Sequence, residues 1–389
     1  MLKLPATLFP IMAIVAWSHP IPDIPVIGNF FRDGTVTIEV EIDPRCFEND
    51  PEKVPYMVKS SLEKIDPDKR QILIQQAGKL AVDSFRCRFV PRDWFDPEFS
   101  FTFGKMGGGK LEQPEDKVVL QGHWQTKILP DMTGYQVHAD PDTGLAIVFT
   151  NRIDGVAQKE VHVLFPDEES FILELKRAKV EGASATNGKS EASTRGDGKG
   201  KGGYWITFSS FLRQGFVHVI PKGVDHILFV LGLFLLSRKW KPLLLQVSAF
   251  TVAHTITLGL ATLGLLSAKT QIVEVIIALS ITAIALQNIF QPKYNHSRLY
   301  IIFILGLVHG LGFAGALSEL GLQPTALATG LVGFNIGVEF GQIAILIPAY
   351  YSTKAIRDPE QYRKWIVVPA SLIIATVGLY WVFERLGGF

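Results

Sequence analysis

Cysteine and charged residues are scarce in this chain. Its 389 residues include only two cysteines, carry a formal net charge of +1, and are 19% charged against 48% hydrophobic. The near-zero charge argues against nucleic acid as a partner, because that interaction requires a basic face. Two cysteines without a C-x-x-C pair are weak support for a thiolate metal site. No Walker-type phosphate loop is present, so the sequence offers no motif for coupling to nucleotide hydrolysis.

The first residues have the pattern of a secretory signal. Residues 1–18 contain one lysine, a short apolar core and small residues near Ser18, after which we expect cleavage. Both cysteines, Cys46 and Cys87, follow this segment and would lie in an oxidising compartment. A bridge between them would close a loop of about 40 residues and contribute roughly 4 kcal/mol in the chain-entropy model. We therefore predict a Cys46–Cys87 disulfide.

Residues 19–179 have the pattern of a β-rich domain. Apolar and polar residues alternate with period two in six segments, 35–42, 84–90, 117–125, 144–151, 160–166 and 170–178. A long helix-compatible stretch over 51–82 separates the first two of them. We predict a β-sandwich-like domain with a helical insertion. It would lie outside the cytoplasm, where it could recruit a protein partner.

The rest of the chain is mostly apolar. Residues 180–203 contain almost no large apolar side chains, which predicts a flexible linker over 180–205. Six apolar segments of bilayer-crossing length then follow, 211–236, 243–266, 271–291, 299–317, 327–351 and 365–384. The sequence therefore predicts a polytopic α-helical membrane domain of about six transmembrane helices over 206–389.

Lysine and arginine are divided unequally between the two sets of loops. If the β-rich domain lies outside, the cytoplasmic loops hold nine of these residues, and the outer connections and tail hold only Lys269 and Arg385. This asymmetry is typical of the positive-inside rule. Together with the signal pattern, it predicts a multi-pass protein of the bacterial cytoplasmic (inner) membrane with its N-terminal domain outside the cytoplasm.

Ionisable residues inside the predicted spans are the most informative feature of the chain. Each costs a few kcal/mol or more at membrane depth unless it is paired, hydrated or bound to a metal. They are His218, Asp225, His226, His254, His309 and Glu339. Imidazole and carboxylate ligands suit a borderline divalent cation such as nickel, cobalt or zinc. We predict a metal site formed by these six residues, with a proton relay as the competing interpretation.

Helical spacing groups further polar residues around this site. The residues predicted to support it or to line a path are Thr251, Thr255, Glu274, Ser280, Asn335 and Gln342. A threonine hydroxyl beside His254 could accept an imidazole N–H and set the tautomer. Asn335, Glu339 and Gln342 share one helix face. Glycines 333, 337 and 341 form a ridge on roughly the opposite face, where another helix can approach closely. Pro221 and Gly223 predict a kink or break between His218 and Asp225.

Five segments of the membrane part resemble the HupE/UreJ family of bacterial membrane proteins. They are GFVHVIPKGVDHILFVLGLFLL, FTVAHTITL, VEVIIALSI, GLVHGLGFA and FNIGVEFGQ, within roughly 205–350. This family is associated with hydrogenase and urease gene clusters and is regarded as nickel permeases. The resemblance implies that the six ionisable residues form a metal path. The large exported domain departs from the short family members and leaves the substrate of this chain open.

These observations lead to one main functional prediction and two alternatives. The main prediction is a permease, not an enzyme, for a divalent transition metal, with nickel first and zinc or cobalt as further candidates. The first alternative is an intramembrane zinc hydrolase resembling alkaline ceramidases, in which Ser280 would stand beside the metal and a zinc-bound water would attack. The second is a membrane anchor or assembly protein whose exported domain recruits a partner. The oligomeric state stays open.

Overall fold

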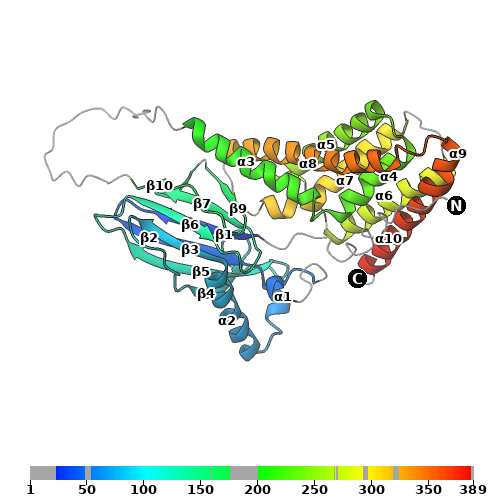
Figure 1. The fold of residues 1–389 in the computed structure, drawn as a ribbon. Coiled ribbons are helices and arrows are strands. Elements are labelled where there is room, and N and C mark those ends of the chain that lie inside the picture. The colour runs from blue at the N-terminus through cyan, green and yellow to red at the C-terminus, as the bar shows by residue number, and fades with distance from the viewer. Residues whose placement is uncertain are drawn as a thin grey trace. The chain divides into compact units, whose positions relative to one another are not determined.

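The structure is a computed structural model that describes most of the chain. The described residues are 23–48, 54–158, 160–175, 200–266, 268, 270–291, 297–318 and 324–386. The predicted signal peptide, and the predicted linker before Gly200, lie outside these ranges. A β-rich unit takes up most of the residues before 211, and a helical unit takes up most of those after it (Figure 1). Each unit is described by itself below.

The β-rich unit contains a large mixed sheet. Its strand order is β4-β5-β2-β1-β7-β8, and β9 also pairs with β7. The strands are β1 Ile24–Phe30, β2 Thr35–Ile42, β4 Ser100–Lys105, β5 Val118–Lys127, β7 Ile147–Ile153, β8 Val156–Ala157 and β9 His162–Leu164. In β2, buried residues alternate with partly exposed ones, as expected where one face of a strand meets the core. β1 pairs antiparallel with β2 and parallel with β7, so the chain enters the middle of the sheet.

A second sheet has the order β10-β6-β3. Its strands are β3 Phe85–Val90, β6 Gly134–Ala139 and β10 Leu173–Glu174. The two sheets share one apolar core, in which Tyr135 contacts Phe30 at 5.3 Å and Phe149 at 5.7 Å between ring centroids. Phe89 stacks on Trp124 of the larger sheet at 6.3 Å. The predicted β-sandwich-like organisation is confirmed.

The predicted helical insertion is present between β2 and β3. It comprises a short 3-10 helix Pro44–Phe47, α1 Lys59–Leu62 and α2 Pro67–Ser84. The Asp66 carboxylate accepts a hydrogen bond from the Asp68 N–H at the start of α2, where Pro67 has no N–H that would need an acceptor. Ala77 and Ala81 face the core of the β-rich unit.

The predicted Cys46–Cys87 disulfide is not present in the structure. Both cysteines are free thiols. The Cys87 side chain points into the core, where its Sγ lies 3.5 Å from the Tyr135 hydroxyl, while Cys46 belongs to the short helix after β2. Burial raises the pKa of each thiol to about 12, so both stay protonated and unreactive at neutral pH.

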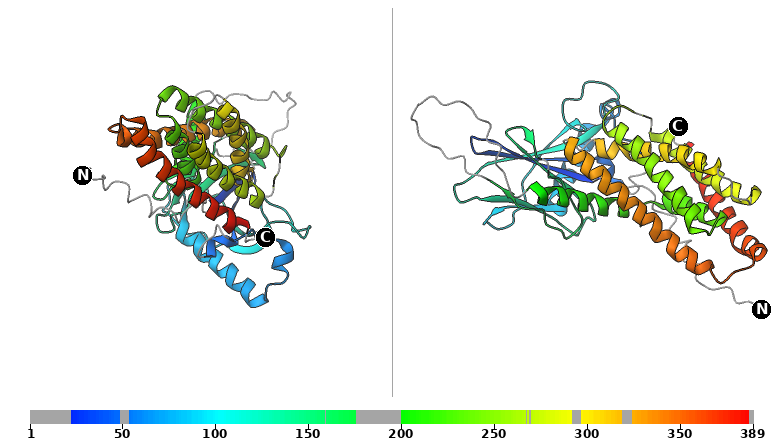
Figure 2. Two further views of the ribbon diagram at one scale, coloured as in Figure 1. Left: turned by 90° about the vertical axis from the view of Figure 1, so that its right-hand side faces the viewer. Right: turned by 90° about the horizontal axis from the view of Figure 1, so that it is seen from above.

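The helical unit contains every apolar segment predicted from the sequence. Its helices are α3 Gly200–Val219, α4 Val224–Leu236, α5 Trp240–Thr262, α6 Thr270–Phe290, α7 Ser297–Ser318, α8 Pro324–Thr353, α9 Pro359–Tyr362 and α10 Val368–Leu386. A π-helical turn, Arg363–Val367, joins α9 to α10. α8 is the longest of these helices, and Figure 2 shows it in orange, running on past Pro348. α3 begins at Gly200, so the last residues of the predicted linker are helical.

The number of long spanning helices is lower than the six predicted. Among the described residues, four helical stretches are long and apolar enough to cross a membrane, namely 240–262, 272–290, 325–353 and 359–386. α3 and α4 make a fifth only if they count together, because they meet at a bend of 71°. The described apolar part of α7, Ser297–Gly312, is shorter. The predicted kink between His218 and Asp225 is thus a break, which divides the first expected span in two.

Glycines allow the helices of this unit to pack closely. A Cβ at Gly337 would lie 2.0 Å from the Leu212 carbonyl oxygen, and one at Gly341 would meet Val219 at 2.8 Å. Gly310 of α7 lies as closely against the His254 carbonyl of α5. Because Gly337 and Gly341 of α8 meet Leu212 and Val219 of α3, these two helices run side by side, as Figure 1 also shows. The close approach predicted for the glycine ridge of α8 is thus confirmed at these two glycines.

Arg298 is buried at the start of α7. It is one of the nine basic residues counted in the predicted cytoplasmic loops, and it is only 1% exposed. Its Nη1 donates to Asn288 Oδ1 at 3.1 Å, and Asn288 Nδ2 donates to the Gly232 carbonyl at 2.8 Å and to Ser371 Oγ at 3.4 Å. This hydrogen-bonded group joins α4, α6, α7 and α10. The buried guanidinium is tolerated because it is hydrogen-bonded.

Candidate metal centre

The break between α3 and α4 brings two histidines together. His218 is the penultimate residue of α3, and His226 lies in the first turn of α4. Their ring centroids are 4.9 Å apart. Gly223 permits this approach, because a Cβ there would lie 2.3 Å from the His218 carbonyl oxygen and 3.2 Å from His226 Nδ1. Any larger residue at Gly223 would push the two helix ends apart.

A third imidazole completes what we call the histidine cluster, His218, His226 and His254. His254 comes from α5, and its ring centroid lies 6.4 Å from that of His218 and 6.1 Å from that of His226. One ring nitrogen of each histidine lies within 4.8 Å of the others. Nitrogens around a tetrahedral zinc at about 2.1 Å lie roughly 3.4 Å apart, so small side-chain movements would let all three bind one ion.

His309 lies beside the cluster. It projects from α7, and its ring centroid is 5.6 Å from that of His226. Its Nδ1 lies 2.9 Å from the Leu305 carbonyl oxygen one turn earlier. Four helices thus each contribute one imidazole to the same region of the unit.

Hydrogen bonds at Nδ1 orient three of the four imidazoles. His226 Nδ1 lies 3.0 Å from Asp225 Oδ1, and His254 Nδ1 lies 3.4 Å from Asn335 Oδ1. With the Leu305 carbonyl at His309, each partner is an oxygen that can only accept, so each contact requires the proton on Nδ1. The Nε2 atoms of His226, His254 and His309 then keep their lone pairs. All three are buried and have no hydrogen-bond partner among the described residues.

This pattern is the one that metal-binding imidazoles adopt. A ligating histidine donates its second ring N–H to a carboxylate or carbonyl oxygen, which sets the tautomer and the ring orientation. A buried polar nitrogen without a partner is otherwise costly, by roughly 1–3 kcal/mol. Three such atoms on neighbouring rings are therefore better explained by a ligand than by three separate defects.

Phenylalanines enclose the imidazoles. Phe250 lies 5.0 Å from His309 and 5.9 Å from His226 between ring centroids, and Phe334 lies 5.4 Å from His218. Such apolar surroundings limit water access and strengthen electrostatic interactions with a bound cation.

The two predicted carboxylates have different surroundings. Asp225 Oδ1 accepts from the backbone N–H of His226 at 2.8 Å as well as facing its ring, at the positive N-terminus of α4. Glu339 on α8 accepts a hydrogen bond of 2.6 Å from the Ser248 hydroxyl on α5. The group of side chains that could hold one ion comprises His218, His226 and His254 and includes neither carboxylate. The roles of Asp225 and Glu339 as ligands therefore stay predictions.

A polar stripe between α5 and α8 extends from the cluster. We define it by Ser248 and Thr251 on α5 and Asn335, Glu339 and Gln342 on α8. Besides the contacts given above, Thr251 Oγ1 donates to Gln342 Oε1 at 3.2 Å. The polar face predicted for α8 therefore meets α5, while Gly337 and Gly341 meet α3, as the spacing predicted. From His254 to Ser248, the stripe covers about 9 Å along α5.

Two of the predicted supporting residues, Thr255 and Ser280, have other partners than we expected, while the role predicted for the Glu274 side chain stays a prediction. The Thr255 hydroxyl donates to the Thr251 carbonyl, so the oxygen facing the His254 ring belongs to Asn335 and not to a threonine. Ser280 donates to the Ile277 carbonyl within α6. The Glu274 carbonyl accepts a hydrogen bond from Arg385.

The sequence reasoning missed Ser248, Phe250 and the Leu305 carbonyl. Ser248 precedes Thr251 and Thr255 by three and seven residues, so helical periodicity could have placed it on their face. Phe250 could have been found from its position four residues before His254. The Leu305 carbonyl carries no side-chain signal, although it lies one helical turn before His309.

The helices and the cluster define a class of protein. Multiple apolar helices of spanning length make this a multi-pass membrane protein, and its helical unit brings three histidine side chains together in one cluster. Residues 196–385 match the family model described as HupE / UreJ protein. The membrane part of the chain therefore belongs to the HupE/UreJ family, as the motifs predicted, and this membership supports a role in metal transport.

The family match is confined to the membrane part and does not extend to the β-rich unit. No curated protein and no solved structure matches the chain.

Proposed function

We propose that the protein is a permease that moves a divalent transition metal ion, nickel first, across the membrane toward the cytoplasm. The observation that carries the proposal is the convergence of three imidazole nitrogens inside a multi-pass helical unit. Family membership supports metal transport in general. Nickel is the finer choice, and it rests on imidazole donors and on the resemblance described above.

The ligand chemistry suits an ion that must leave again. Neutral imidazoles bind nickel, cobalt and zinc without the tight grip of thiolates, and the described part of the helical unit contains no cysteine. The accepting oxygens at Nδ1 keep the imidazoles ready to bind without protonation or rotation.

A path follows from the polar stripe. In this proposal, His218 receives the ion, and the histidine cluster with His309 holds it. Glu339 and Gln342 of the polar stripe then offer oxygen ligands toward the C-terminal end of α8. Oxygen ligands bind these metals less strongly than nitrogen ligands do, so the second half of the path favours release.

The orientation is part of the proposal. The loop charges put the β-rich unit outside the cytoplasm and the loops after α4, α6 and α8 inside it, in a bacterial inner membrane. The break between α3 and α4, with His218 beside it, would then be nearest the outside. The C-terminal end of α8 would face the cytoplasm. The β-rich unit could receive the metal from a protein partner.

Uptake of radioactive nickel tests this function. Cells without their own nickel transporters would express the full chain or the His226→Ala variant. We expect the variant to lose nearly all protein-dependent uptake, because it removes an oriented ligand nitrogen. His123→Ala is the matched control, since His123 is a half-exposed histidine on β5 of the β-rich unit.

Equal uptake by wild type and His226→Ala, at equal amounts of protein in the membrane, would rule out the proposed role of the cluster. Competition by zinc or cobalt at equal concentration would show which metal the path prefers.

The cluster also suits a resident catalytic ion, which keeps the hydrolase alternative in view. Three histidines with an open fourth position are the ligand set of several zinc hydrolases. Elemental analysis of purified protein separates the two functions. One zinc per chain that survives dialysis against a chelator, together with hydrolysis of a lipid amide, would favour the enzyme. Rapid loss of the metal would favour the permease.

The anchor alternative makes a different prediction. If the β-rich unit only recruits a partner, deleting 19–205 abolishes the phenotype, and replacing the histidines has no effect. The uptake experiment therefore distinguishes this alternative from the permease as well.

A further inference from the structure

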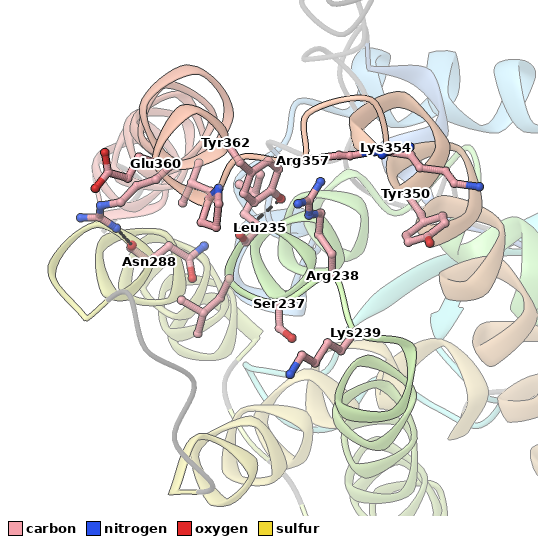
Figure 3. Close-up of a pocket in the computed structure, with 14 residues that line it drawn as sticks. Leu235, Ser237, Arg238, Lys239, Asn288, Tyr350, Lys354, Arg357, Glu360 and Tyr362 are labelled. Atoms are coloured by element: carbon pink, nitrogen blue, oxygen red, sulfur yellow. Dashed lines mark hydrogen bonds between the residues drawn. The ribbon is translucent and has the colours of Figure 1, made fainter.

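A basic pocket lies at one end of the helical unit. It has a volume of about 800 Å³ and is formed where α4, α6 and α8 end and α9 begins (Figure 3). Five basic residues line it, Arg238, Lys239, Lys354, Arg357 and Arg363, against one acidic residue, Glu360. Neither the histidine cluster nor the polar stripe contributes a residue to it.

Two of the arginines are held in place by backbone carbonyls. Arg238 Nη1 donates to the Thr353 and Ile356 carbonyls, both at 2.9 Å, and its guanidinium lies 4.1 Å from the Tyr362 ring centre. Arg363 Nη2 donates to the Ile289 carbonyl at 2.7 Å. A cation that is already ordered loses less entropy when an anion binds. Because carbonyls do not neutralise them, both guanidiniums keep their full charge.

Two further cations of the pocket lack a compensating carboxylate. Lys239 and Arg357 are exposed, and the described residues form no ion pair or side-chain hydrogen bond with either of them. Figure 3 shows both side chains around the same opening as Arg238. The pocket therefore concentrates positive charge that its one acidic residue, Glu360, offsets only in part.

The walls of the pocket are apolar. They are formed by Leu235, Leu236, Tyr350, Pro359, Tyr362 and Val367. A small soluble anion would make no favourable contact with such apolar walls. The glycerol backbone and the first acyl carbons of a lipid would pack against them. The combination of cations at the opening and apolar walls is amphipathic.

Aromatic side chains at the same end mark a membrane interface. Trp240 packs on Tyr350 at 5.4 Å between ring centroids, and the neighbouring Tyr351 and Trp365 are 66% and 59% exposed. Exposed tryptophan and tyrosine at helix ends gather at the level of lipid headgroups. The pocket thus opens at the depth where headgroup phosphates lie.

We propose that this pocket binds the phosphate headgroup of an anionic membrane lipid. The held guanidiniums of Arg238 and Arg363 contact the phosphate, Lys239 and Arg357 add long-range attraction, and the apolar walls receive the start of the acyl chains. Basic pockets between membrane helices are a known form of such sites. Through Arg238 and Arg363, the lipid would tie together the ends of α4, α6, α8 and α9.

Native mass spectrometry of the detergent-purified full chain tests the proposal. Phosphatidylglycerol, cardiolipin or phosphatidylcholine is added, and the bound lipid is counted. We expect one anionic lipid to bind selectively over phosphatidylcholine. Lys239→Gln/Arg357→Gln should weaken binding about 25-fold, because each cation near an anionic lipid contributes about fivefold. Arg238 and Arg363 are left intact because they support the backbone.

The matched control is Lys241→Gln/Lys364→Gln. It removes the same charge from the same end of the unit, but from exposed residues that do not line the pocket. The control should keep wild-type binding. Equal weakening in both double variants would overturn the proposal, because it would show diffuse attraction to the loops. Equal binding of phosphatidylcholine would overturn it too.

A further arm separates lipid from soluble phosphate. Inorganic phosphate or pyrophosphate at millimolar concentration should not displace the bound lipid. Displacement by either would show that the pocket serves a soluble phosphate compound, and the lipid proposal would fall. Neither result bears on nickel uptake, so the lipid site and the proposed transport function can fail independently.

Discussion

Buried polar groups are treated differently in the two units of this chain. In the β-rich unit, several of them pair with other protein groups. Gln136 Oε1 accepts from Arg88 at 2.6 Å and 2.9 Å, its Nε2 donates to the Ser170 carbonyl at 2.7 Å, and Asp43 pairs with Arg45. In the helical unit, the buried Nε2 atoms of His226, His254 and His309 have no partner among the described residues, and the rings of His254 and His309 lie 6.1 Å and 5.6 Å from that of His226 between centroids.

A lone unpaired atom would not support this conclusion. Asn151 and His162 of the β-rich unit also have buried side-chain atoms without partners among the described residues. His162 stacks on Phe171, and burial lowers the pKa of its ring, which keeps it neutral. No second imidazole of the described chain stacks on it, and it is best understood as a core residue. Clustering, not burial alone, distinguishes the membrane histidines.

The largest effect should follow from removing a ligand of the cluster. Structural metal sites contribute about 10–16 kcal/mol from four ligands, or roughly 3 kcal/mol for each ligand. His254→Ala should therefore weaken nickel binding to the purified full chain by a hundredfold or more, measured by equilibrium dialysis. His123→Ala should leave the affinity unchanged. If His254→Ala lowered the nickel affinity by less than threefold, the unpartnered imidazoles of the helical unit would not be metal ligands. They would then not differ from the unpartnered atoms of the β-rich unit.

A smaller effect should follow at the residue that orients His226. Asp225→Asn keeps the size of the side chain but removes its charge. The amide can also present its N–H₂ to the ring, which favours the wrong tautomer. We expect nickel affinity to fall about 10- to 100-fold. The same dialysis measures it, with Asp167→Asn of the β-rich unit as control. An affinity lower than that of His254→Ala would mean that Asp225 is itself a ligand.

Glycine to alanine replacements should have opposite signs in the two units. At Gly337, the new Cβ would collide with the backbone carbonyl of Leu212, which cannot move aside, so we expect a destabilisation of about 1–3 kcal/mol. At Gly78 of α2, no atom lies within 4 Å of the new Cβ. There we expect a stabilisation of about 0.5–1 kcal/mol from the higher helix propensity of alanine.

Separate readouts can follow the two glycine variants in the full chain. The SDS concentration at which helicity falls reports on Gly337→Ala. Thiol labelling of Cys87 in a Cys46→Ser background reports on Gly78→Ala, because both cysteines of the chain belong to the β-rich unit and Cys87 is buried. A stabilising Gly337→Ala would mean that α3 and α8 do not need close contact.

The β-rich unit shows what sequence patterns can and cannot predict. β2 was predicted with its observed bounds, because one face meets the core and the other does not. β1, β4, β6 and the two-residue β8 were missed. Most residues of β6 are buried on both faces, so it lacks the alternation that marks a half-exposed strand. Of the predicted strand 170–178, the structure describes residues up to 175, and among these only Leu173 and Glu174 pair with β6 as β10.

In the helical unit, the free-energy cost of ionisable side chains in lipid predicts the site residues better than helical periodicity does. The expense of ionisable groups in lipid is enough to single out all four histidines from the amino-acid sequence. The relative placement of His218 and His226 could not be predicted. Helical spacing applies only to a continuous helix, and the chain turns by 71° between these two residues. Asn335 was predicted as a supporting residue, but its contact with His254 follows only from helix packing. The Leu305 carbonyl comes near His309 through helix geometry and was not predicted.

The smallest expected effect tests whether paired charges stabilise the β-rich unit. The Asp116 carboxylate accepts hydrogen bonds of 2.8 Å from Lys105 Nζ and from the N–H groups of Gln113 and Glu112. The bond from Lys105 and then those from the backbone lower its pKa from 3.8 to about 2. Because the folded pKa lies below the unfolded one, the ionised carboxylate stabilises the fold above about pH 4. This stabilisation is lost as the pH falls toward 2.

Labelling of Cys87 with a pyridyl disulfide, which reacts in acid, measures this loss in the Cys46→Ser chain. Rates are taken relative to the same chain unfolded in urea. Between pH 5 and pH 2, labelling should speed up in the parent and less so in Asp116→Asn, which already lacks the charge at pH 5. Identical acceleration in both would show that other carboxylates govern acid unfolding. The contrast between paired charges in the β-rich unit and unpaired imidazoles in the membrane would then rest on the helical unit alone.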